Sequence, residues 1–208
     1  MSAIVKAAAV ACCAAALAAA GVAAPLRPEP PAAAAQDRAP PVRAGGTLAV
    51  PEGYRTGFVA LGTWAVASDA PTGDAAEFHG VYAAEEIVEA YRSTGRFPDG
   101  AVLVKEVATA RAGDMTTGRV SRAGEVLGWF VMVKDTEGRY PGDPLWGDGW
   151  GWAWFDAGAP EEAVTTDYRE ECLGCHVPAQ GTDWVYVEGY PLLRDRATTG
   201  GAARPPAG

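Results

Sequence analysis

Ala101–Ala108 reads AVLVKEVA, and its mostly β-branched and apolar side chains alternate along the segment. This pattern predicts a β-strand. Because successive side chains of a strand point to opposite sides, Leu103, Lys105 and Val107 share one face. Two further segments predict strands, the second with three tryptophans on one face: Glu125–Lys134 (EVLGWFVMVK) and Trp150–Phe155 (WGWAWF).

Strand and helix signals elsewhere complete the expected fold. The apolar residues of Ala84–Thr94 recur at helical spacing, and Gly95 follows where a glycine commonly ends a helix. A second helix is expected at Thr165–Cys175. Two more strands are expected before the first helix, at Thr56–Ala67 and Phe78–Tyr82. The sequence therefore predicts an α+β fold, mainly an antiparallel β-sheet with a few helices.

The composition excludes several classes of protein. The 208 residues carry a formal net charge of −9, which disfavours a nucleic-acid partner because phosphate binding requires a basic surface. The 26 glycines and 16 prolines favour loops and argue against a helical bundle. The length suggests a single domain that can bury a core without disulfide bonds.

Residues 1–24 have the layout of a secretory signal peptide, in which Lys6 precedes a run of small apolar residues ending in alanine. This layout predicts cleavage and export to the periplasm, and the alternative is an uncleaved membrane anchor. Residues 25–46 are rich in Pro, Ala and Arg without apolar periodicity, so we expect a disordered linker. The folded domain is then expected at 47–196 and a flexible tail at 197–208.

Cys172-Leu-Gly-Cys175-His176 has the spacing of a c-type haem attachment motif. Positions three and four apart share a face of a helical turn, so both thiols and the imidazole point to one side. The thiols would form thioethers with the haem vinyl groups, and His176 would ligate the iron. The alternatives are a disulfide, a redox-active pair and a zinc site, for which too few Cys and His follow the signal peptide. The motif predicts one covalently bound haem c near the C-terminus.

A sixth iron ligand would separate an electron carrier from a protein with an open iron site. After the signal peptide, the chain offers His79, Met115 and Met132. Met132 lies in an apolar strand, where methionine usually fills the core. Met115 lies in a loop and stays a candidate, as does His79, the only imidazole besides His176.

A series of short segments carries a further signal. They are Pro51–Arg55 (PEGYR), Leu61-Gly-Thr63, Val81-Tyr82, Ser93–Gly100 (STGRFPDG), Val102–Glu106 (VLVKE), Trp152–Phe155 (WAWF), the haem motif, and Thr182-Asp183 through Tyr190-Pro191. In this order and spacing they resemble the cytochrome P-460 family. Its members are exported, homodimeric c-haem proteins with a mostly antiparallel β fold. The resemblance implies the same organisation here over roughly Leu48 to Arg194.

The resemblance also implies roles for single residues. The family's distinguishing feature is a lysine joined covalently to a haem meso carbon, and the matching position is Lys105. The position of the family's second-sphere carboxylate is Asp167, where the shorter side chain stands in place of Glu. His79 falls where members carry a polar distal residue, often Arg, and would donate a hydrogen bond to a ligand or ligate the iron. The residues alone leave open whether Lys105 reaches a haem or snorkels to water.

Three functions follow as hypotheses. Family members with the cross-link oxidise hydroxylamine to nitrogen oxides and pass electrons to an external acceptor such as another cytochrome. The related cytochrome c′-beta proteins lack the cross-link and bind nitric oxide or carbon monoxide. A six-coordinate haem with His79 or Met115 on the iron would serve electron transfer instead. The resemblance favours the first hypothesis.

Overall fold

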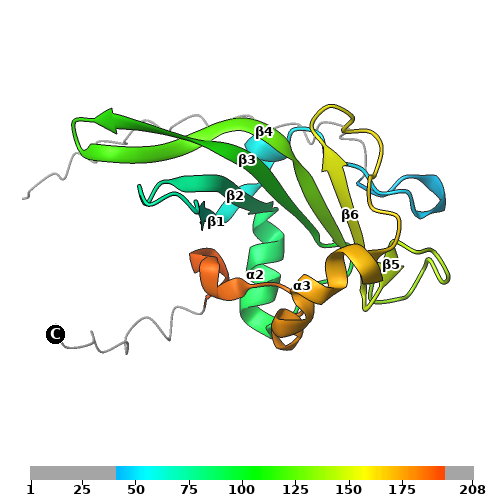
Figure 1. Ribbon diagram of the computed structural model, residues 1–208. Helices are drawn as coiled ribbons and strands as arrows, with labels where there is room; N and C mark the ends of the chain where they lie inside the picture. Colours follow the sequence, from blue (N-terminus) through cyan, green and yellow to red (C-terminus); the bar gives the residue numbers. More distant parts are fainter. Residues whose placement is uncertain (1–40, 195–208) are drawn as a thin grey trace, which may run out of the picture. The chain divides into compact units, whose positions relative to one another are not determined.

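The computed structural model describes residues 41–194, which form a six-stranded antiparallel sheet with few helices (Figure 1). The strand order is β1-β2-β3-β4-β6-β5. This architecture confirms the predicted α+β class. The strands are β1 (Val59–Ala67), β2 (Ala75–Ala83), β3 (Val102–Met115), β4 (Gly118–Lys134), β5 (Trp146–Gly147) and β6 (Trp150–Asp156).

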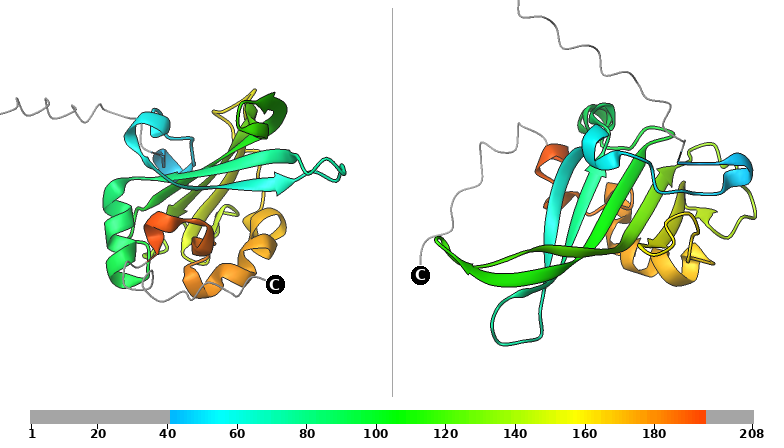
Figure 2. Two further views of the ribbon diagram at one scale, coloured as in Figure 1. Left: turned by 90° about the vertical axis from the view of Figure 1, so that its left-hand side faces the viewer. Right: turned by 90° about the horizontal axis from the view of Figure 1, so that it is seen from above.

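Helical segments lie on both sides of this sheet. Figure 2 shows α2 and the C-terminal helical segments against one face, and the N-terminal segments, including α1, against the other. The helices and helical turns are η1 (Ala44–Gly46), α1 (Tyr54–Gly57), α2 (Glu85–Thr94), η2 (Arg169–Leu173), α3 (Gly174–His176), η3 (Val177–Thr182), η4 (Val187–Gly189) and η5 (Pro191–Leu193). The inner parts of the central strands are therefore covered on both faces.

β3 and β4 are longer than predicted because they continue into a hairpin beyond the rest of the sheet. The added residues pair down to Met115 opposite Gly118. Most of them are exposed on both faces, so apolar alternation does not mark them. Gly118 has φ 111°, a conformation that favours glycine at the turn.

Three further predicted boundaries differ from the observed ones, and the first is β2, which begins at Ala75 rather than at Phe78. β1 begins at Val59 because Tyr54–Gly57 forms a helical turn, α1. The C-terminal helix begins only at Arg169, since residues 164 and 165 run alongside β6. There the Trp154 amide donates to Thr165 Oγ1 at 2.9 Å. Helix α2 ends as predicted, with Gly95 at φ 72°.

The start of the folded domain also differs from the sequence-based boundary at residue 47. Residues 41–46, assigned above to the linker, pack against the sheet. Val42 forms a β-bridge with Leu48, and the Trp146 indole donates to the Gly46 carbonyl at 2.9 Å. The sequence carries no periodicity there because these contacts are made by single residues with distant partners.

The remaining sequence-based assignments lie outside the described residues. These are the signal peptide at 1–24, the linker up to residue 40 and the tail at 197–208. Within residues 41–194, no helix combines the length and apolar character needed to span a membrane.

A cluster of polar contacts links the turn before β3 to the residues that follow β4. Asp99 accepts hydrogen bonds from the Thr136 amide and hydroxyl, both at 2.9 Å, and pairs with Arg139. The Arg139 guanidinium holds the pKa of Asp99 well below the usual 3.8. A carboxyl whose pKa falls on folding stabilises the protein above its unfolded pKa, and this contribution disappears as the pH falls through its folded pKa.

We therefore predict that Asp99→Asn lowers the melting temperature by about 2–4 °C at pH 7. The difference from the parent protein should shrink below about pH 4, where the unfolded carboxyl becomes protonated. Thermal unfolding followed by circular dichroism at several pH values measures this. A difference that stays constant down to pH 2 would contradict the assigned role.

Candidate functional site

A largely apolar cavity of about 380 Å³ lies between the sheet and the C-terminal helical segments. Its size falls within the range of small-molecule and cofactor sites. It gathers residues from β1, β2, β3, β4 and β6, from the haem motif and the residue before it, and from the segment 185–190. They are Trp64, His79, Val81, Leu103, Lys105, Phe130, Val131, Met132, Trp152, Ala153, Glu171, Cys172, Cys175, His176, Val185, Tyr186 and Tyr190.

The two cysteines of the motif lie on consecutive helical segments at the wall of this cavity. Cys172 belongs to η2, a π-helical turn, and Cys175 to α3. Both are free thiols, Cys172 buried and Cys175 exposed. Burial is the main cause that raises the pKa of Cys172 to about 11. Both sulfurs are thus available as thiols beside one cavity.

The imidazole of His176 is fixed by one hydrogen bond and two aromatic contacts. Its Nδ1 lies 2.6 Å from the carbonyl oxygen of Trp184. A carbonyl only accepts, so Nδ1 carries the proton and Nε2 keeps its lone pair. Trp152 packs edge-on against the ring at 5.0 Å between centroids. Burial lowers the pKa of His176, which favours the neutral, metal-ligating form.

Lys105 reaches the same cavity from the central strand β3. On the sheet it lies opposite Val81 of β2 and Phe130 of β4. Its Nζ is 4.2 Å from the centroid of the Phe130 ring, and no ion pair holds it within residues 41–194. Burial lowers the pKa of Lys105. This lysine differs from Lys134, which is paired with Asp183 at 2.7 Å.

Of the proposed sixth ligands, the structure places His79 and Met132 at the cavity and Met115 away from it. Met115 is 62% exposed at the end of β3, in the hairpin. The sequence predicted a loop at Met115, and nothing in that pattern indicated that this residue lies away from the cavity. His79 Nε2 contacts Glu77 Oε2 at 2.9 Å, so this nitrogen donates to a carboxylate.

The structure separates two acidic residues before the motif. Asp167 does not line the cavity, and its Oδ1 accepts the Arg169 amide at 2.9 Å, at the start of η2. Glu171 does line the cavity. Its Oε1 accepts from the amide and hydroxyl of Thr166 at 3.0 and 2.7 Å. The Thr166 hydrogen bonds lower the pKa of Glu171, so it is a carboxylate at neutral pH.

The Cytochrome P460 family model matches residues 51–187. The chain belongs to the cytochrome P460 family. It is therefore a c-type haem cytochrome, and the family implies a haem cofactor. A search of curated proteins found no match.

The chain's side chains fit a haem of this cytochrome class. Two free thiols and a neutral imidazole lie on one wall of an apolar cavity. Among the described residues, no three His, Cys, Asp or Glu side chains gather as a metal site of protein ligands would require. Haem iron brings its own porphyrin nitrogens and needs only an axial residue from the protein, so His176 suffices.

Two features of the cytochrome's site lay beyond sequence reasoning. No sequence pattern distinguishes Glu171 from a surface charge, and its place beside the cavity depends on the turn of η2. The carbonyl of Trp184 carries no side-chain signal at all. The tryptophans divide between the faces: Trp64 and Trp152 line the cavity, whereas Trp129 donates to Tyr54 on the opposite face.

Proposed function

We propose that this cytochrome oxidises hydroxylamine at a single, covalently bound haem c with an open iron site, and passes the electrons to an external acceptor such as another cytochrome. Cys172 and Cys175 would hold the haem through thioethers, His176 would ligate its iron through Nε2, and Lys105 would bond a meso carbon. When bound, the haem supplies a redox-active iron for a small nitrogen compound. The proposal includes export to the periplasm, on the features of residues 1–24, and a homodimer.

The observation that carries the proposal is the convergence of Lys105 with the haem motif in one cavity. A partly buried ammonium that has no ion pair among residues 41–194 is costly, and burial lowers the pKa of Lys105. The bond from Nζ to a meso carbon replaces one N–H and one C–H. It releases two electrons and two protons, which an oxidant of the peroxide class would take up.

His79 supports an open site rather than a six-coordinate one. Ligation through Nε2 would break its 2.9 Å contact with Glu77. With Nε2 donating to Glu77, His79 instead presents a polar ring at the cavity for a small ligand. This arrangement favours an enzyme or a gas-binding protein over an electron carrier.

Hydroxylamine oxidation also requires a proton acceptor. Each hydroxylamine that becomes nitric oxide gives up three electrons and three protons. The electrons pass to the external acceptor. We assign proton uptake to the Glu171 carboxylate rather than to Asp167, because Glu171 lines the cavity and Asp167 does not. From Glu171, at the exposed rim, protons reach solvent.

Mass spectrometry of the protein from a host competent in cytochrome maturation tests the proposal. A proteolytic fragment should join the Lys105 peptide to the haem peptide, while the Lys134 peptide, the internal control, stays free. The same preparation should reduce an artificial one-electron acceptor when hydroxylamine is added. A free Lys105 peptide together with no turnover would overturn the proposal.

Glu171→Gln is predicted to reduce hydroxylamine turnover by about 100-fold, the lower range for loss of a general base. Gln keeps the size and the acceptor toward Thr166 but cannot take up a proton. Asp167→Asn is the matched control and should stay within about threefold of the parent. Steady-state rates and optical spectra of both variants decide between the two carboxylates. A larger loss of turnover in Asp167→Asn than in Glu171→Gln would show that Asp167 is the proton acceptor.

Capture of nitric oxide or carbon monoxide is the second candidate. The contact of Lys105 with the Phe130 ring favours this gas-binding function, because the cation–π interaction stabilises a lysine ammonium that has not reacted with the haem. It predicts an ordinary c-haem spectrum, rapid gas binding and no hydroxylamine turnover.

A further inference from the structure

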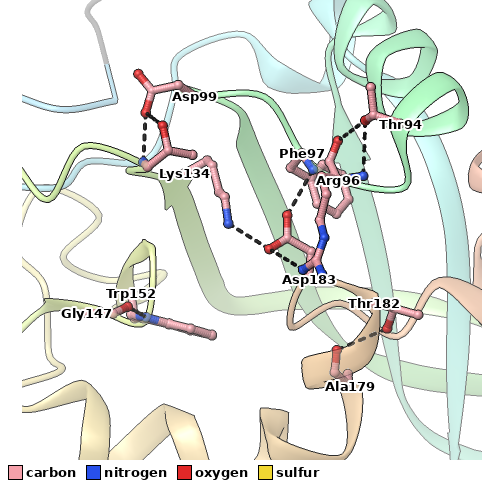
Figure 3. A network of polar contacts seen from close by, with 11 residues as sticks. Thr94, Arg96, Phe97, Asp99, Lys134, Gly147, Trp152, Ala179, Thr182 and Asp183 are labelled. Atoms are coloured by element: carbon pink, nitrogen blue, oxygen red, sulfur yellow. Dashed lines mark hydrogen bonds and ion pairs between the residues drawn. The ribbon is translucent and has the colours of Figure 1, made fainter.

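Asp183 is a buried carboxylate that the proposed reaction does not use. Its side chain is 4% exposed, and Oδ1 accepts from Lys134 Nζ at 2.7 Å. Oδ2 accepts from the Phe97 amide at 2.9 Å. Figure 3 shows the carboxylate between Lys134 at the end of β4 and the segment before β3 that carries Phe97. Two separate parts of the chain thus hold this side chain.

The backbone at Asp183 adopts a conformation that needs such support. Asp183 has φ 61° and the following Trp184 has φ 69°, both in the left-handed region that non-glycine residues rarely occupy. Two consecutive residues in this region persist only where the surroundings fix them. The chain's own bonds contribute as well, since the Trp184 amide donates to the Ala179 carbonyl at 2.9 Å.

This turn ends on the carbonyl that orients the haem ligand. The Trp184 carbonyl is the acceptor for His176 Nδ1 at 2.6 Å. The Trp184 ring also packs edge-on against Trp152, which in turn contacts the His176 ring. The anchored carboxylate of Asp183 is therefore one residue from the oxygen that sets the orientation of the imidazole.

We infer that Asp183 is a positioning residue, whose carboxylate, held by Lys134 and the Phe97 amide, fixes the Trp184 carbonyl against His176 Nδ1. The inference rests on His176 being the iron ligand, as in the proposed function. A hydrogen bond from Nδ1 makes Nε2 a stronger donor and fixes the ring plane. Loosening the turn weakens that bond, and with it the electron donation to the iron.

The test compares holoprotein of the parent and of Asp183→Ala by resonance Raman spectroscopy and redox titration. The iron–histidine stretching band of the ferrous protein should move to lower frequency and broaden. The reduction potential should rise, because a weaker ligand stabilises ferric iron less. Asp183→Asn keeps an acceptor for the Phe97 amide and tolerates positive φ, so it should recover part of both shifts.

Lys134→Met provides a second variant of similar length. It removes the nearer of the two cations that face Asp183, while Arg96 at 3.9 Å and the Phe97 amide remain, and should shift both readouts in the same direction by less than Asp183→Ala. Asp99→Asn is the control, since Asp99 bonds Thr136 and Arg139 and no cavity residue. Asp99→Asn should lower thermal stability and leave the iron–histidine stretching band and the reduction potential unchanged.

The outcomes separate a positioning role from a structural one. Asp183→Asn and Lys134→Met proteins that unfold earlier but keep the parental band and potential would overturn the inference, even if Asp183→Ala does not fold. A parent protein without a haem iron–histidine band would instead contradict the proposed function, and this inference with it.

Discussion

Replacing Lys105 by Leu is expected to reduce hydroxylamine oxidation by about 100-fold or more while the haem stays attached through Cys172 and Cys175. The amine is the only group of this side chain that can bond a meso carbon. Leu suits the apolar surroundings on β3, where Leu103 and Val107 share its face. The loss is therefore expected in the chemistry rather than in folding.

Optical spectra and steady-state rates measure this effect together. The spectrum of Lys105→Leu should become that of an ordinary c-type haem, and gas binding should persist. Lys105→Arg is the matched control for charge: it keeps a cation beside Phe130 but should not form the cross-link. An Lys105→Leu protein with the parental spectrum and turnover would show that Lys105 is not bonded to the haem.

The second large effect is expected from the motif cysteines. The double variant Cys172→Ala, Cys175→Ala, made in the Lys105→Leu background so that no meso-carbon bond can form, should retain no covalently held haem, because no other free thiol lies among residues 41–194. Extraction into acidified organic solvent, followed by the haem absorbance left in the protein, measures this. With Lys105→Leu alone all haem should stay with the protein, and in the double variant made in that background all should be extracted.

The single cysteine variants refine this result. Each should keep one thioether and remain resistant to extraction, with a spectrum shifted by the unreacted vinyl group. Cys172→Ala also leaves a small void at a buried position, so its melting temperature should fall more than that of Cys175→Ala, whose side chain is exposed. Haem that resists extraction in the double variant would contradict thioether attachment at this motif.

Much of the site could be predicted from the sequence because its residues lie in short, regular patterns. Strand alternation put Lys105 on the face of Leu103 and Val107, and the pairing of β3 with β2 keeps that register. The spacing of Cys172, Cys175 and His176 needs only one stretch of helix. Each of these signals depends on neighbours within a few positions, which is why a sequence can display them.

Local patterns in the sequence were enough to predict the antiparallel strands, the helix ending at Gly95, the haem motif and the family. The packed chain was needed to show which acidic residue lines the cavity, where Met115 lies, and that Asp183 and Lys134 hold the turn carrying the Trp184 carbonyl. Local patterns are set by backbone periodicity and propensity. Contacts between β4, the segment before β3 and the C-terminal turns form only when segments distant in the sequence pack together. Because every residue has a backbone carbonyl, the sequence does not indicate which carbonyl accepts the hydrogen bond from His176.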